Sequence, residues 1–124
     1  MRIIIADDSS IFRERIIVLL NEIPGLDIAA ETKNVPDTIQ TVKQMEPEIL
    51  LLDIQMPGGS GVEVLQVLKK KNKLPETVIV ITNYPYPQYK DRCLKEGAHH
   101  FLDKTNESEK VIEIINDLIQ KNLD

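Results

Sequence analysis

Residues 49–57 of this 124-residue chain read Ile-Leu-Leu-Leu-Asp-Ile-Gln-Met-Pro. The four apolar residues at its start are typical of a short strand that is buried on both faces, as in a parallel sheet. The run stops at Asp53, and residues 56–61, Met-Pro-Gly-Gly-Ser-Gly, have the composition of a turn. The sequence therefore predicts a buried strand that places a carboxylate at the edge of a sheet.

Four further segments have the composition of strands, namely 2–6, 26–31, 77–82 and 98–102. Several of them also end in polar residues. Asp7 and Asp8 follow the first segment, Thr82 closes the segment before the last, and Lys104 follows the last. Apolar residues at helical spacing separate the strands, in stretches at 10–23, 35–45, 62–68, 86–96 and 106–123.

Strict alternation of strands and helices predicts an α/β fold, a doubly wound sheet of five parallel strands covered by helices on both faces. The length fits one domain over residues 1–124. Sheets of this kind bind ligands at the carboxyl ends of their strands. We therefore expect the residues at the strand ends to meet at one edge of the sheet, namely Asp7, Asp8, Asp53, Thr82 and Lys104.

Three carboxylates that meet at one edge repel one another unless a cation lies among them. Mg²⁺, or Mn²⁺ in its place, prefers oxygen ligands and suits this set, whereas zinc would require His or Cys. Asp8 and Asp53 are predicted to bind the ion directly and Asp7 to hold a metal-bound water. A phosphoryl group at this site could be accepted by Asp53, with Lys104 and Thr82 contacting its oxygens.

The Asp7-Asp8 pair, the run 52–57 with Gly61 four residues further on, Thr82 and Lys104 resemble the receiver domain of two-component response regulators. The resemblance spans nearly the whole chain. It implies a flavodoxin-like fold with strand order 2-1-3-4-5 and no output domain within residues 1–124. It also implies that the backbone carbonyl of Gln55 is a metal ligand beside Asp8 and Asp53.

The resemblance further implies a function and partners. Asp53 would take its phosphoryl group from a phosphohistidine on a sensor histidine kinase or a histidine phosphotransfer protein. Thr82 and the aromatic Phe101 would then act as switch residues that change the surface of the fourth helix, fifth strand and fifth helix. A downstream target protein, or onward phosphorelay, would read that surface. The chain would be a signalling protein rather than a turnover enzyme.

Some residues depart from the receiver pattern. Asn83 stands where a small residue is usual and narrows access to the site, and Thr105 stands where proline is usual, so that a cis bond is not expected. Phe101 replaces the usual tyrosine. Tyr84 is interpreted either as a shield that prolongs the life of the phosphorylated form or as a surface residue without a kinetic role.

Composition limits the remaining classes. A net charge of −5, with no basic block beyond the short stretch at 69–73, argues against direct nucleic-acid binding, and the longest apolar runs are too short for a membrane span. With no signal peptide and a single cysteine, Cys93, the chain is expected to be cytoplasmic, as a monomer or weak dimer. Cys93 is expected to be a packing residue.

Two alternatives were weighed against the receiver interpretation. A haloacid-dehalogenase-like phosphohydrolase would carry a second acid where this chain has Gln55, and a degenerate receiver would lack part of the acidic and basic set. Three surface features were also predicted from the sequence: an exposed pair at His99 and His100, a tyrosine-rich segment at 84–89 that either binds a partner or packs locally, and an exposed face of the last helix at Ile112 or Ile114.

Overall fold

The computed structural model describes residues 1–123. Its elements are β1 (Arg2–Ala6), α1 (Ser10–Leu20), β2 (Asp27–Thr32), α2 (Val35–Met45), β3 (Ile49–Leu52), β4 (Gln55–Met56), β5 (Gly59–Ser60), α3 (Gly61–Lys70), β6 (Thr77–Thr82), α4 (Pro87–Lys95), β7 (His100–Asp103) and α5 (Ser108–Leu123). Five strands form a parallel sheet in the order β2-β1-β3-β6-β7. Strands β6 and β7 are the fourth and fifth strands of this sheet along the chain, because β4 and β5 pair separately. The predicted doubly wound fold and its order 2-1-3-4-5 are therefore confirmed.

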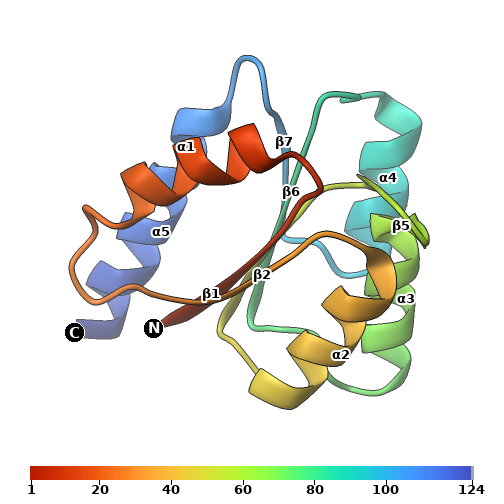
Figure 1. Ribbon diagram of the computed structural model, residues 1–124, viewed down its shortest axis with the longest axis horizontal. Coiled ribbons are helices and arrows are strands. Elements are labelled where there is room, and N and C mark those ends of the chain that lie inside the picture. The colour runs from red at the N-terminus through yellow and green to blue at the C-terminus, as the bar shows by residue number, and fades with distance from the viewer. Residues whose placement is uncertain (124) are drawn as a thin grey trace.

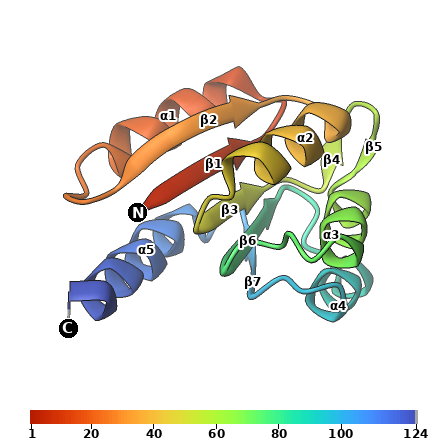
Figure 2. The same ribbon diagram turned by 90° about the horizontal axis from the view of Figure 1, so that it is seen from below.

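Helices cover both faces of the sheet. Helices α1 and α5 lie on one face and α2, α3 and α4 on the other (Figures 1 and 2). Each central strand serves both cores, because Ile3 and Ile5 pack on the side of α1 and α5 while Ile4 and Ala6 pack on the opposite side. Burying one such aliphatic side chain contributes about 1.5–3 kcal/mol, so the two cores hold the strand ends in fixed positions.

Local signals in the sequence explain where helices begin and end. The Ser9 hydroxyl accepts a hydrogen bond from the Phe12 amide at 3.2 Å and caps α1. Asn34 caps α2 in the same way. After α4, Gly97 adopts a φ of +109°, and a Cβ at this position would lie 2.7 Å from Leu74 Cδ1. The positive φ favours glycine at that turn, whereas the Leu74 side chain could move to make room for a Cβ.

The buried face of α1 differs from the predicted stripe. The sequence predicts that the apolar residues at helical spacing within 10–23, Leu19 among them, pack on the sheet, but Leu19 is 40% exposed. The buried positions are Arg13, Ile16 and Leu20, which follow one another at helical spacing. Because one of the buried residues is an arginine, the pattern of apolar residues alone did not predict which face of α1 is buried.

The end of the chain also departs from expectation. Strand β7 begins at His100 rather than Ala98, and α5 begins at Ser108 rather than Asn106. The Asp103 carboxylate explains the later start, since it accepts hydrogen bonds from the Thr105 amide at 2.9 Å and the Asn106 side chain at 3.0 Å. These bonds stabilise a non-helical turn at residues 103–106, where the first turn of the helix was predicted. The bond between Lys104 and Thr105 is trans, as expected.

Two predictions about side chains can be compared with their burial. His100 is half-buried, so the prediction of an exposed histidine pair is wrong for this residue, and His99 accepts a hydrogen bond from the Val78 amide through Nδ1. Ile112 and Ile114 pack against the core beside α1 and do not form an exposed face. No helix within residues 1–123 has both the length and the apolar character needed to span a membrane.

Cys93 was expected to be a packing residue, and its side chain is fully buried in the core beneath α4. Burial raises the pKa of this thiol to about 11, although the charge of Arg92 opposes the shift. A thiol that stays protonated at neutral pH is a poor nucleophile. Both observations agree with a structural role for Cys93.

Candidate functional site

Three aspartates gather at the carboxyl edge of the sheet. Asp7 and Asp8 follow β1 and Asp53 follows β3, and a carboxylate oxygen from each lies within 4.8 Å of the others. Asp7 and Asp53 are 1% and 5% exposed, whereas Asp8 is exposed to solvent. The cluster therefore has a buried floor and one open side, on which Asp8 lies.

Strand pairing brings these residues together from distant parts of the chain. Ala6 pairs with Leu52 in the parallel register of β1 and β3, and the Asp53 amide donates to the Ala6 carbonyl at 2.9 Å. On the other side of β1, the Asp7 amide donates to the Thr32 carbonyl at 2.9 Å. Asp7 and Asp53 are thus adjacent because neighbouring strands end at the same level.

Lys104 reaches the cluster from the end of β7. Its ammonium lies 2.6 Å from Asp7 Oδ2 and 3.0 Å from Asp53 Oδ2, and its side chain is 6% exposed. Its backbone amide donates to the Thr82 carbonyl at 2.9 Å, which fixes the start of the loop. The structure therefore brings together four of the predicted site residues, namely Asp7, Asp8, Asp53 and Lys104.

The charges in this cluster do not balance. Three carboxylates and one ammonium leave a formal charge of −2. Burial raises the pKa of Asp53, and the nearby Asp7 adds to the rise, while Lys104 opposes it. Burial lowers the pKa of Lys104, but its contacts with Asp7 and Asp53 outweigh that effect, so the net shift is upward. The site therefore favours a charged Lys104 and penalises an ionised Asp53.

The donor set fits a hard divalent cation. All three side chains offer carboxylate oxygens, and the deficit of two positive charges equals the charge of Mg²⁺ or Mn²⁺. Asp7 Oδ2 is buried and, among residues 1–123, receives no well-aligned hydrogen bond despite the nearby ammonium. A carboxylate oxygen has two lone pairs, so Asp7 Oδ2 has capacity for a polar partner in addition to Lys104.

Thr82 lies at the carboxyl end of β6 and is fully buried. Its hydroxyl oxygen accepts a hydrogen bond from the Tyr84 amide at 3.1 Å, which leaves the hydroxyl proton free to be donated. In the register of β6 and β7, Thr82 pairs with Asp103 and Val80 pairs with Phe101. Because alternate residues share a face, Thr82 and Phe101 lie on the same face of the sheet.

Phe101 is half-buried and packs against the core formed by α2, α3 and α4. It lies two residues before the end of β7, so it is not part of the acidic cluster. Its position beneath α4 is nevertheless on the face that carries Thr82. Thr82 and Phe101 are thus on the same side of the sheet, at and two residues before the strand ends respectively.

Gln55 lies in a small hairpin that the sequence did not predict. Strands β4 and β5 pair antiparallel, with Gln55 opposite Ser60, and the Gln55 amide donates to Asp53 Oδ1 at 3.3 Å. At the base of this hairpin, a Cβ on Gly61 would lie only 2.6 Å from the Asp53 carbonyl oxygen. Glycine at 61 therefore allows the hairpin to close directly against the backbone of Asp53.

Two residues beside the site were not predicted from the sequence. The Phe12 ring lies under Lys104, with Nζ 4.5 Å from the ring centroid. The Arg13 guanidinium is buried and donates to the Asp7 carbonyl and to Glu31. The available signal was the 13, 16, 20 spacing, in which an arginine shares the buried face of α1 with aliphatic residues.

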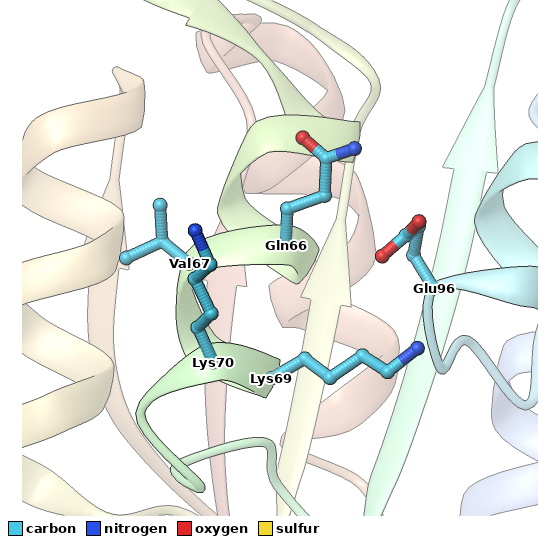
Figure 3. A pocket seen from close by; sticks show the side chains of 5 residues that line it. All are labelled: Gln66, Val67, Lys69, Lys70 and Glu96. Atoms are coloured by element: carbon cyan, nitrogen blue, oxygen red, sulfur yellow. The ribbon is translucent and has the colours of Figure 1, made fainter.

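A separate cavity of about 580 Å³ lies between α3 and the end of α4. Figure 3 shows Lys69 extending from α3 toward the segment that carries Glu96, and its ammonium donates to the Lys95 carbonyl at 3.3 Å. None of the acidic-site residues lines this cavity, whose walls are formed by Gln66, Val67, Lys69, Lys70 and Glu96. The chemistry described above is therefore confined to the sheet edge.

Comparison with known proteins gives several relatives. A protein-glutamate methylesterase/protein-glutamine glutaminase from Treponema denticola is 33% identical over 110 residues, which cover 88% of this chain and 30% of that protein. A response regulatory protein from Yersinia pestis is 32% identical over 126 residues, covering 98% of this chain and 51% of that protein. The chain thus spans about half or less of these relatives.

Solved structures agree on the fold. The signal receiver domain of the response regulator NarL from Mycobacterium tuberculosis superposes with a TM-score of 0.86 at 24% identity, covering 96% of this chain and 95% of that one. A DNA-binding response regulator of the LuxR family from Staphylococcus aureus gives 0.84 at 29% identity, covering 94% and 96%. The response regulator receiver domain family matches residues 3–116. Because that match extends over most of the chain, the chain belongs to the family of response regulator receiver domains.

Proposed function

We propose that this receiver domain is a phosphorylation switch in which Asp53 accepts a phosphoryl group. The observation that carries the proposal is the environment of Asp53, a buried carboxylate 3.0 Å from the Lys104 ammonium and within 4.8 Å of two other carboxylates. A carboxylate in such a cluster is available as a nucleophile, and the surrounding charges can position and neutralise an incoming phosphoryl group.

A divalent cation, Mg²⁺ or Mn²⁺, belongs to this proposal. Asp8, Asp53 and the backbone carbonyl of Gln55 would hold it directly, and Asp7 would act through a water. When bound, the ion would neutralise charge on the phosphoryl oxygens and on the acidic cluster. The formal charge of −2 among the four side chains and the close approach of the three carboxylates support this assignment.

The transfer step follows from the residues at the sheet edge. An oxygen of Asp53 forms a bond to phosphorus, the N–P bond of a donor phosphohistidine breaks, and its electron pair returns to the imidazole nitrogen. Lys104 moves from its contact with Asp53 Oδ2 to a phosphoryl oxygen, and its positive charge stabilises the developing negative charge. The product is an acyl phosphate on Asp53, with the free histidine on the donor.

Thr82 and Phe101 form the readout in this proposal. The Thr82 hydroxyl donates its free proton to a phosphoryl oxygen, and in doing so it loses its bond from the Tyr84 amide. The segment before α4 is then released, and Phe101 turns inward on the same face of the sheet. The phosphoryl group can shift this equilibrium only by its differential affinity for the two conformations.

The partners in this proposal are of two kinds. A sensor histidine kinase or a histidine phosphotransfer protein supplies the phosphoryl group, and a target protein or a further phosphorelay component reads the surface of α4, β7 and α5. An aromatic cluster lies at the start of α4, with the rings of Tyr84 and Tyr86 6.3 Å apart and those of Tyr86 and Tyr89 5.8 Å apart. Tyr84 and Tyr86 are exposed, whereas Tyr89 packs against the core, and exposed tyrosines favour protein contacts.

The test is phosphorylation of the purified chain by a promiscuous phosphorylated histidine kinase in Mg²⁺. Wild type should be labelled, while Asp53→Asn should not, because the amide is a much weaker nucleophile. Asp27→Asn removes a carboxylate from the exposed start of β2 and serves as the matched control, which should be labelled like wild type. Equal labelling of Asp53→Asn and wild type would refute Asp53 as the phosphoacceptor.

A further inference from the structure

Arg13 is a buried charged residue in the first half of α1. It is 6% exposed and lies on the same helical face as Ile16 and Leu20. Arginine is rarely buried unless its guanidinium is fully paired, because desolvation of the charge is costly. The partners of Arg13 therefore indicate why it occupies a position suited to an aliphatic residue.

The guanidinium connects three elements. Nε donates to Glu31 Oε1 on β2 at 3.0 Å, and Nη1 donates to the backbone carbonyl of Asp7. That carbonyl lies one residue beyond the end of β1 and so requires a donor from outside the strand. Arg13 provides this donor from within the protein, and the bond is buried.

Besides the contact of its Oδ2 with Lys104, Asp7 is held by three hydrogen bonds. Its amide donates to the Thr32 carbonyl at 2.9 Å, its Oδ1 accepts from the Ser9 amide at 2.8 Å, and its carbonyl accepts from Arg13. The carbonyl of Asp7 and the amide of Asp8 belong to one planar peptide group. The bond from Arg13 therefore fixes the direction in which the chain enters Asp8.

Few other contacts hold Asp8 in position. It is exposed, and its carboxylate accepts no hydrogen bond from the residues that the structure describes, yet it lies within 4.8 Å of Asp7 and Asp53. We propose that Arg13 is a positioning residue that presents Asp8 to a divalent cation by orienting the Asp7–Asp8 peptide. This inference rests on the proposed function only in taking Mg²⁺ as the ion.

The charge of Arg13 and its orienting hydrogen bond predict opposite effects on cation affinity when Arg13 is removed. If its positive charge were the main influence, its removal would strengthen cation binding, since like charges repel. If orientation dominates, its removal weakens binding despite that gain. Residues that orient metal ligands typically contribute roughly 10- to 100-fold in affinity, which sets the scale of the expected loss.

The experiment measures Mg²⁺ affinity of the intact chain by calorimetry and by the amide shift of Asp8 in NMR titration, without any phosphodonor. Arg13→Met removes the charge but keeps an unbranched apolar chain suited to the buried face, and circular dichroism verifies that it is folded. We expect roughly 10- to 100-fold weaker binding. Arg13→Lys keeps a single donor group and should recover part of this loss.

Arg15→Gln is the matched control, since it removes the same charge from an exposed position on the same helix. It should change Mg²⁺ affinity little. Binding by Arg13→Met that equals or exceeds that of wild type, or a loss that Arg15→Gln reproduces, would overturn the positioning role. Absence of Mg²⁺ binding by wild type would instead contradict the proposed function, and the inference about Arg13 with it.

Discussion

The Lys104 ammonium lies 4.5 Å from the centre of the Phe12 ring, on the side of the site formed by α1. The same ammonium contacts Asp7 and Asp53, so it is held between two carboxylates and an aromatic face. A cation over an aromatic face gains about 0.5 kcal/mol when exposed and about 2 kcal/mol when desolvated. The Lys104 side chain is 6% exposed, so the contact belongs near the upper end of this range.

Replacing Phe12 with Leu should therefore slow phosphorylation of Asp53. The ring would be lost while an apolar side chain of moderate size remains, so Lys104 would be less well held for contact with the phosphoryl group. We expect a rate loss of roughly 2- to 30-fold, the equivalent of the cation–π energy. Phe12→Tyr keeps the ring and is the control. A Phe12→Leu protein that is phosphorylated at the wild-type rate would contradict this prediction.

Gly61→Ala should push against the backbone of Asp53 and Ile54 and lower the stability of the protein. The added Cβ would lie 2.6 Å from the Asp53 carbonyl oxygen and 2.9 Å from Ile54 Cα, and both are backbone atoms that cannot rotate away. Overpacking of this kind typically costs about 1–3 kcal/mol of unfolding free energy, which urea denaturation measures. Ser60→Ala, one residue earlier, is the control and should be close to wild type. Equal stability of Gly61→Ala and wild type would contradict this prediction and would show that the hairpin accommodates the methyl group without loss of unfolding free energy.

Most of the fold was predictable because its signals are local. The apolar runs that form β1, β3 and β6 are fully or almost fully buried, and the residues that end them arrive at one edge by the register of a parallel sheet. Asp53 and Lys104 could therefore be placed together from the order of elements alone. The short hairpin at Gln55 was not predictable, since two pairs of residues carry no periodic pattern.

The supporting residues of the site could not be predicted for a different reason. Phe12 reads as one more apolar residue of an amphipathic helix, and its contact with Lys104 depends on how α1 lies against the loop after β7. Arg13 reads as a solvated charge, because burial of a guanidinium depends on partners such as Glu31 that lie on another strand. Their roles follow from tertiary packing, which the sequence pattern does not contain.

Stability should fall as the solution is acidified through the titration of His100. Burial lowers the pKa of its half-buried imidazole, and the neighbouring His99 adds to the effect. Between that lowered pKa and the ordinary value of 6.5, the unfolded chain binds a proton that the folded protein does not. Unfolding free energy is therefore highest above pH 6.5 and decreases below it.

His100→Gln should flatten this dependence, because glutamine does not titrate. Urea denaturation of both proteins between about pH 7.5 and pH 5.5 measures the difference in slope. The carboxyl of Asp53 acts in the opposite direction, since its pKa is raised by burial and its protonation relieves a cost in the folded state. Both proteins share this contribution, so it cancels in the comparison. A slope unchanged by the substitution would contradict the role of His100.

Tyr84 is the residue whose substitution tests whether the site is shielded from water in the phosphorylated form. Its amide donates to the Thr82 hydroxyl at 3.1 Å, and its ring is 44% exposed beside Tyr86. Under the proposed function, rotation of Thr82 toward a phosphoryl group would break this bond and would leave the ring free to cover the open side of the site. Tyr84→Ala should then lose its acyl phosphate faster than wild type, because water reaches the phosphorus more easily.

Tyr84→Phe keeps the ring and should resemble wild type. The measurement is decay of the ³¹P signal after removal of the donor, and decay of Tyr84→Ala at or below the wild-type rate would leave Tyr84 as a surface residue without a kinetic role.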